Sequence, residues 1–267
     1  MTRMAISCFF AGAVLACMGE EEVAKPSDWH FAANAVYSSR SLDGVIVSRN
    51  AINDGIYGDM VTTGDAMGVD DSQSAMLAIA AQYKRLGVGL NYMPTSFEGK
   101  GTALVAGTGA NAGFFFQTPL DTRINVDMLL GSAYYNLIQT PDTVFGLGVG
   151  LGQTMVDIAI TPQVGTALAY DGQLPFGFLR LHFKSRYNRF LYGFALNGLS
   201  MDVDGTSISY SDYTVDLGYR LVDKRYKLDL VGGYRLVNFA ADMEWDGGEI
   251  ATDVSLEGPF LGVTINY

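Results

Sequence analysis

Apolar and polar residues alternate one by one along most of this chain. From Tyr213 to Leu221 every second residue is apolar, and the residues between them are polar or small. Side chains at positions i and i+2 share one face of a β-strand, so this segment predicts a strand with one apolar face. The same pattern recurs in the ranges 74–83, 86–92, 124–131, 145–152, 179–184, 190–197, 228–237 and 261–267. The sequence therefore predicts an all-β protein with antiparallel strands.

The connections between these segments are alternately short and long. The short ones are 84–85, 139–142, 186–188 and 223–225, and the long polar ones are about 39–72, 98–118, 161–172, 202–208 and 246–250. Aromatic residues of the apolar faces gather beside the short connections: Tyr83, Phe183, Phe190, Tyr192, Tyr219 and Tyr226, with Trp29 and Tyr267 near the ends. Short turns on one side, long loops on the other and aromatic girdles are typical of transmembrane barrels. We therefore expect an antiparallel transmembrane β-barrel rather than a soluble sandwich, which also alternates.

The number of strands follows from the same pattern. We expect ten, at about 29–38, 73–84, 86–98, 121–138, 143–160, 173–185, 189–203, 208–221, 226–245 and 250–267. An even number returns both termini to the periplasmic side, beside the short turns. The Gly-rich segment 101–118 either projects as a hairpin or adds two strands, so eight to twelve strands remain possible.

The composition of the chain argues against nucleic-acid binding and against a metal or cofactor site. Charged residues make up only 17% of the chain, and the net charge is −11. Nucleic-acid binding needs a basic face, so a nucleic-acid partner is not expected. With two histidines and two cysteines in the whole chain, we expect no metal site and no cofactor.

The N-terminal residues have the features of an export signal. Arg3 precedes an apolar run from Ala5 to Ala16, which is too short to span a bilayer as a helix. We expect a signal peptide at 1–16, a periplasmic linker at 17–28 and the barrel at 29–267. The stretch before Cys17 also resembles a bacterial lipobox, so lipidation of Cys17 is an alternative form of processing.

The signal segment, the alternating strands and the last strand resemble small Gram-negative outer-membrane barrels of the OmpA/OmpW-like type. The last strand carries Leu261, Val263, Ile265 and Tyr267 on one face. In that family, a terminal strand with an aromatic last residue is recognised by the barrel-assembly machinery, although Phe is commoner there than Tyr. The resemblance implies a location in the bacterial outer membrane, with membrane lipids and lipopolysaccharide as partners. It implies no activity, because one architecture supports many functions.

The polar faces of the predicted strands carry charged residues that we expect inside the barrel. They are Asp127, Arg180, His182, Lys184, Asp216, Arg220, Asp229 and Arg235. The interior of a small barrel is nearly filled by side chains, and buried charges must be paired. We therefore expect a charge network that plugs the lumen, while Leu217, Leu230 and Val263 face lipid. A narrow polar path whose selectivity these charges set is the alternative.

Two further features have an ordinary structural explanation. Gly146, Gly148, Gly150 and Gly152 alternate within one strand, so they predict a bare stripe on the lumen wall against which bulky side chains pack. They do not predict a nucleotide-binding loop, which needs a helix after the glycines. Neither His30 nor His182 has a Ser or an acid at a spacing that suggests catalysis. We expect both to pack or hydrogen-bond in the lumen.

Three functions remain after these steps. A structural or surface-interaction barrel with a filled lumen is preferred, without enzymatic activity, and a narrow channel for ions or small solutes is the second. A lipid-modifying enzyme would need a Ser, a His and an acid at the outer rim, which the sequence does not supply. The long loops are acidic, which indicates a solvated surface; bridging of these loops to lipopolysaccharide by divalent cations is the alternative.

Overall fold

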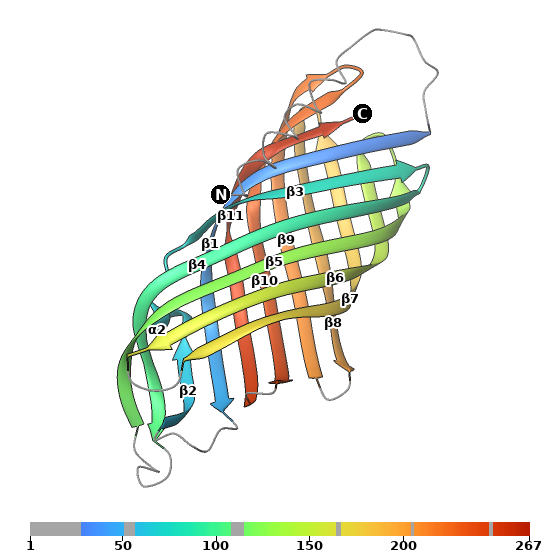
Figure 1. Cartoon of the computed structure of the whole chain (residues 1–267). Helices are drawn as coiled ribbons and strands as arrows, with labels where there is room; N and C mark the ends of the chain where they lie inside the picture. Colours follow the sequence, from blue (N-terminus) through green and yellow to red (C-terminus); the bar gives the residue numbers. More distant parts are fainter. Residues whose placement is uncertain (1–27, 51–56, 108–114, 164–166, 204–205, 246–247) are drawn as a thin grey trace.

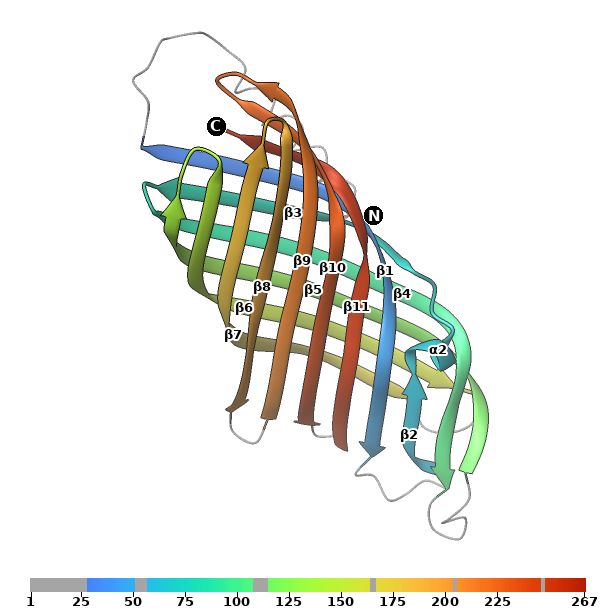
Figure 2. The same cartoon turned by 180° about the vertical axis from the view of Figure 1, so that it is seen from behind.

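The computed structural model describes residues 28–50, 57–107, 115–163, 167–203, 206–245 and 248–267. Within them, eleven antiparallel strands form one sheet that closes on itself, because the last strand pairs with the first (Figure 1; Figure 2). The strands are β1 (Trp29–Asn50), β2 (Tyr57–Thr63), β3 (Ser72–Tyr83), β4 (Leu86–Gly107), β5 (Phe115–Gln139), β6 (Thr143–Pro162), β7 (Leu168–Tyr187), β8 (Phe190–Val203), β9 (Thr206–Asp223), β10 (Lys227–Trp245) and β11 (Gly248–Asn266). The predicted signal peptide, Cys17 and all of the predicted linker except Asp28 lie outside the described residues.

The strands β2 and β3 occupy one place in the ring. The first part of β1 pairs with β3, and its later part pairs with β2. The short helix α2 (Gly64–Met67) lies between them in sequence. The ring therefore has ten strands, as the sequence predicted, with the second strand interrupted.

The prediction of a long loop at 39–72 is wrong. The strand β1 continues to Asn50, and β2, α2 and the start of β3 fill much of the remainder. The loop expected at 98–118 is also shorter, because β4 and β5 extend the hairpin to the pair Ala106 and Phe115. The segment 101–118 therefore belongs to a projecting hairpin and adds no separate pair of strands.

Local contacts hold α2 against the barrel wall. The Thr63 hydroxyl accepts a hydrogen bond from the Ala66 amide at 3.2 Å, and Gly68 ends the helix with a positive φ of 59°. The helix backbone lies directly on β4, since a Cβ at Gly101 would be 1.9 Å from the Ala66 carbonyl oxygen. The helix thereby buries Met67 completely in the barrel interior.

The half of the barrel beside the tight turns has an apolar outer face. We call this end the turn end, at the top of Figure 1, and the opposite end the loop end. On β11 the outer face is apolar from Tyr267 back to Pro259, nine residues, which matches the 9–11 residues of a transmembrane strand. Leu217, at 67% exposed, lies on the outer face with Leu230 and Val263, as expected. Exposed aromatic side chains surround the turn end: Trp29, Tyr83, Phe190, Tyr192, Tyr219, Tyr226 and Tyr267.

In the loop-end half the two faces of the wall exchange their polarity. Outer-face side chains there hydrogen-bond to one another: Ser96 to Asn125 at 2.7 Å, Gln153 to Gln173 at 2.6 Å and Asn238 to Ser211 at 3.2 Å. Large apolar side chains occupy the inside of the same strands. Since β1, β4 and β5 are 22, 22 and 25 residues long, about half of each extends past the apolar band.

Ring closure depends on the last residues of the chain. The strands β1 and β11 pair from Ala32 and Asn266 to Asn50 and Gly248. Beyond this ladder, the backbones of Phe31 and Tyr267 exchange hydrogen bonds of 2.9 and 2.8 Å.

Deleting Asn266 and Tyr267 should prevent stable closure of the barrel. The deletion removes the last backbone pairs between the two closing strands, and lipid offers unpaired amides no substitute partners. We expect loss of the heat-modifiable folded band on unboiled gels and accumulation of unfolded protein in the periplasm. The control Tyr267→Phe keeps the backbone and the ring, so it should keep the folded band. Normal membrane levels of folded truncated protein would contradict this role of the terminal residues.

Candidate functional site

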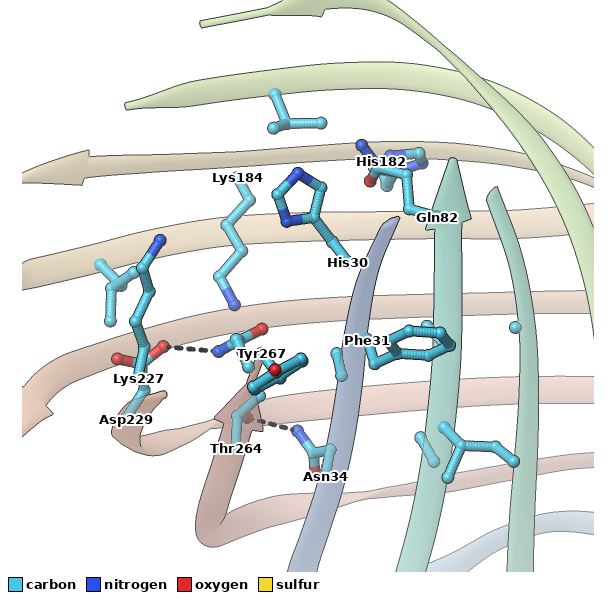
Figure 3. Close-up of a pocket in the computed structure, with 18 of the residues that line it drawn as sticks. His30, Phe31, Asn34, Gln82, His182, Lys184, Lys227, Asp229, Thr264 and Tyr267 are labelled. Atoms are coloured by element: carbon cyan, nitrogen blue, oxygen red, sulfur yellow. Dashed lines mark hydrogen bonds between the residues drawn. The ribbon is translucent and has the colours of Figure 1, made fainter. Parts of the chain in front are cut away.

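The turn-end half of the lumen is a cavity of about 1250 Å³, which we call the vestibule. Its walls include Asn34, Tyr134, Arg180, His182, Lys184 and Asp229. Residues of the tight turns at 139–142 and 224–225 also line it, so its mouth lies at the turn end. Figure 3 shows His30 from β1 and Lys184 from β7 facing the same space.

Basic side chains outnumber acidic ones in the vestibule lining. The basic ones are Arg180, Lys184, Arg186, Arg220, Lys224, Arg225 and Lys227, and the acidic ones are Asp142 and Asp229. Arg220 donates to Asp229 at 2.8 Å, and Arg186 donates to Asp142 at 2.8 Å. For Arg180 and Lys184, no carboxylate in the described part of the chain lies within 4.0 Å of a side-chain nitrogen.

The glycine stripe of β6 is covered by bulky side chains, as the sequence predicted. A Cβ at Gly146 would lie 2.5 Å from His182 Cε1, and one at Gly150 would lie 2.1 Å from the Phe178 ring. The rings of His182 and Tyr134 make a T-shaped contact with their centroids 4.9 Å apart, and His182 Nε2 lies 3.1 Å from Asn136 Oδ1. The glycines therefore provide the room in which His182 packs.

A layer of buried charge lies beyond the vestibule, and we call it the charged layer: Arg40, Arg235 and Asp212. Arg235 donates to both Asp212 oxygens, at 2.8 and 2.7 Å, and Asp212 is fully buried. Asn197 and Tyr210 also donate to Asp212, at 2.9 and 3.1 Å. The carboxylate thus accepts hydrogen bonds from its own strand, β9, and from both neighbouring strands, β8 and β10.

Arg40 reaches the same layer from β1, which is separated from β10 only by β11. It is 2% exposed and donates to Thr95 Oγ1 at 2.7 Å and to Met76 Sδ. Arg235 also points to this sulfur, with Nη1 at 3.6 Å. Sequence reasoning missed Arg40, because it fell in an expected loop. It also missed Asp212, although Asp212 shares the inward row of Asp216 and its periodicity could have found it.

Apolar side chains fill the loop-end half of the lumen. This apolar plug includes Met93, Phe97, Met128, Phe176, Val237 and Phe239, all of them buried. The centroid of the Phe176 ring lies 4.6 Å from that of Tyr210 and 6.5 Å from that of Phe239, so aromatic rings from β7, β9 and β10 pack together in the interior. The lumen therefore consists of three successive parts: the vestibule, the charged layer and the plug.

The predicted charge network divides among these parts. Arg180, His182, Lys184, Arg220 and Asp229 line the vestibule, and Arg235 lies in the charged layer. Asp216 faces the lumen, with Oδ1 3.1 Å from the position of a Cβ on Gly193. These residues do not form one connected network, and most of the material that fills the lumen is apolar.

The placement of Asp127 in the lumen is wrong. Its carboxylate lies on the outer face, where it accepts a hydrogen bond from the Tyr92 hydroxyl at 3.1 Å. Its neighbour Met128 points into the plug instead. Asp127 lies past the apolar band, where water surrounds the wall and the polar face of the strand turns outward.

Comparison with solved structures identifies the architecture. The chain superposes on the outer-membrane protease OmpT of Escherichia coli with a TM-score of 0.56 and 13% identity, covering 92% of this chain and 99% of that one. The fold is that of a Gram-negative outer-membrane β-barrel protein. We therefore place the barrel in a bacterial outer membrane.

Other similarities are weaker. The barrel matches the outer-membrane protein OprG of Pseudomonas aeruginosa with a TM-score of 0.37 and 11% identity, over 89% of this chain and 95% of that one. The match to the outer-membrane protein AlkL has a TM-score of 0.38 and 12% identity, over 94% and 97% of the two chains. No family model matches the sequence, and neither does any curated protein.

The described residues also lack two other features, a membrane-spanning helix and a cluster of metal-ligating side chains. They contain no helix that is long and apolar enough to span a membrane. Among the same residues, no group of three or more His, Cys, Asp or Glu side chains is placed to hold a metal ion.

Replacing Asp212 by Asn should strongly destabilise the barrel. The change keeps the shape of the side chain but leaves the Arg235 guanidinium buried without a counter-ion, which costs about 3–5 kcal/mol. Chemical denaturation of the refolded protein in lipid vesicles measures the free energy of unfolding. The same substitution at the exposed outer-face residue Asp171 is the control and should change this free energy by less than about 0.5 kcal/mol. Equal effects at the two positions would show that the charged layer contributes no special stability.

Proposed function

We propose that this protein is a non-conducting outer-membrane barrel that carries a polar surface beyond the membrane for interaction with other molecules. The apolar plug is the observation that carries the proposal. A lumen constriction lined by apolar side chains excludes water and ions, so it closes a pore. The plug comes from strands on opposite sides of the ring, so it is part of the barrel core. On this proposal the barrel has no enzymatic activity.

The outer face of the loop-end half supports an interaction role. Its exposed carboxylates include Asp43, Asp71, Asp157, Asp171 and Asp253. Two outer-face bases are already paired there, since Arg123 lies 2.8 Å from Glu98 and Lys100 lies 3.5 Å from Asp121. The free charge on this surface is therefore negative, which favours cationic partners and divalent cations that bridge to lipopolysaccharide phosphates.

The orientation follows from general barrel architecture. We place the turn end and both termini in the periplasm and the loop end outside the cell, because outer-membrane barrels have short periplasmic turns. Membrane lipids and lipopolysaccharide then surround the apolar band, and the barrel-assembly machinery recognises the last strand during insertion.

A narrow channel is the second candidate, and the vestibule favours it. A cavity of about 1250 Å³ already reaches from the turn end towards the charged layer. Passage would still require the charged layer and the plug to move aside.

Planar-bilayer recording separates the two candidates. The unmodified protein should show no steady conductance if the plug closes the lumen. Replacing Phe176 and Phe239 together by Ser should produce small currents, because it removes two adjacent rings and admits water. The control replaces Phe31 and Phe190 by Ser on the outer face, and it should remain silent. Large stable currents from the unmodified protein would favour the channel.

A further inference from the structure

Two basic side chains of the vestibule, Arg180 and Lys184, have no carboxylate within ion-pair distance in the described part of the chain, whereas Arg186 and Arg220 are paired with Asp142, Asp223 and Asp229. Arg180 makes one long hydrogen bond, from Nη1 to Asn197 Oδ1 at 3.4 Å, and its buried Nε has no hydrogen-bond partner there. Lys184 lies on the same inward row of β7, and its strand register places Gly193 between it and Asp216. Asp216 nevertheless remains beyond ion-pair distance.

This local charge is opposite to that of the whole molecule. The chain has a net charge of −11, yet basic residues dominate the vestibule wall. Charges of one sign in a cleft with low-dielectric walls focus the electric field and raise the local concentration of the opposite ion. The lining of the vestibule therefore favours anions, although the protein as a whole is acidic.

Neutral donors accompany the basic residues. Asn34, Gln82, Asn91 and Ser132 line the cavity from β1, β3, β4 and β5, opposite or beside the β7 row. Figure 3 shows Asn34, Gln82 and Lys184 around the cavity. Amide and hydroxyl groups can donate to the oxygens of a phosphate or carboxylate while the guanidinium and ammonium groups supply charge.

The shape of the cavity restricts the type of ligand. Arg180, Lys184 and the neutral donors face the lumen and not the lipid. The ligand therefore arrives from water through the mouth at the turn end and is not a membrane lipid. The charged layer and the plug lie at the far end of the cavity, so the mouth at the turn end is its route of entry, and Arg180 and Lys184 in its wall are the groups that can retain an anion. The volume of about 1250 Å³ accommodates a small organic molecule, since such pockets commonly measure about 300–1,000 Å³.

We propose that the vestibule binds a water-soluble anion with at least two negative charges, such as a small organic phosphate or polycarboxylate. Arg180 and Lys184 hold its anionic groups. This binding does not depend on whether the barrel conducts, so it is tested independently of the proposed closed lumen.

Calorimetric titration with inorganic pyrophosphate tests the proposal. The full chain, refolded in nanodiscs of zwitterionic lipid, should bind one pyrophosphate per barrel saturably. Replacing Arg180 and Lys184 together by Gln should weaken binding by at least about tenfold, because it removes both charge-assisted contacts. The matched control, Lys100→Gln with Arg123→Gln, removes two outer-face charges and should change the affinity by less than about twofold, because exposed charges are screened.

A folding control keeps the result interpretable. Each variant must retain the heat-modifiable band on unboiled gels. Arg180→Lys is a second, milder variant that retains the charge, and it should bind more tightly than Arg180→Gln. The proposal is overturned if the unmodified protein shows no saturable binding, or if the vestibule variants bind as tightly as the outer-face control.

Discussion

The requirement that every backbone amide in lipid have a hydrogen-bond partner governs this structure. Lipid provides no donors or acceptors, so the sheet must close on itself, and β11 pairs with β1 along almost its whole length. The interruption of the ring between β2 and β3 obeys the same rule. The helix α2 separates β2 from β3 in the loop-end half, past the apolar band, where water can satisfy backbone groups. Near the turns the ladder between β1 and β3 is continuous from Trp29 to Arg40.

The surrounding medium then determines which face of each strand is apolar. Within the apolar band, apolar side chains such as Leu217 and Val263 face the lipid, and polar side chains such as Arg220 and Asp229 face the lumen. Past the band the outer face is in water, and polar side chains such as Ser96 lie on it. The inside must then be apolar, because otherwise this half would have no core. The charged layer lies near the level of this exchange, since Asp212 is adjacent to the outward Tyr213.

Period-two alternation predicts strands well but cannot by itself say which face points inward. It gave the correct facing for Asp216, Asp229 and Arg235, because these strand segments lie within or next to the band. It failed at Asp127, because the assumption that the apolar face meets lipid does not hold beyond the membrane. The same assumption led us to predict a loop for the second half of β1, where the apolar residues point inward. The vestibule depends on how far side chains from opposite strands reach, which a linear pattern does not contain.

The exchange of polarity also gives the two halves of the barrel different thermodynamic properties. Unfolding the loop-end half exposes Phe97, Phe176 and their neighbours to water, so it carries a positive heat-capacity change, as in a soluble domain. The apolar band faces hydrocarbon in the folded state and gains little from the hydrophobic effect between its own residues. Cooling weakens the hydrophobic effect and therefore lowers the stability of the loop-end core. The stability of the hydrogen-bonded ring within the membrane depends less on this effect, so it decreases much less. One continuous sheet thus combines two regions whose stabilising interactions differ in their dependence on temperature.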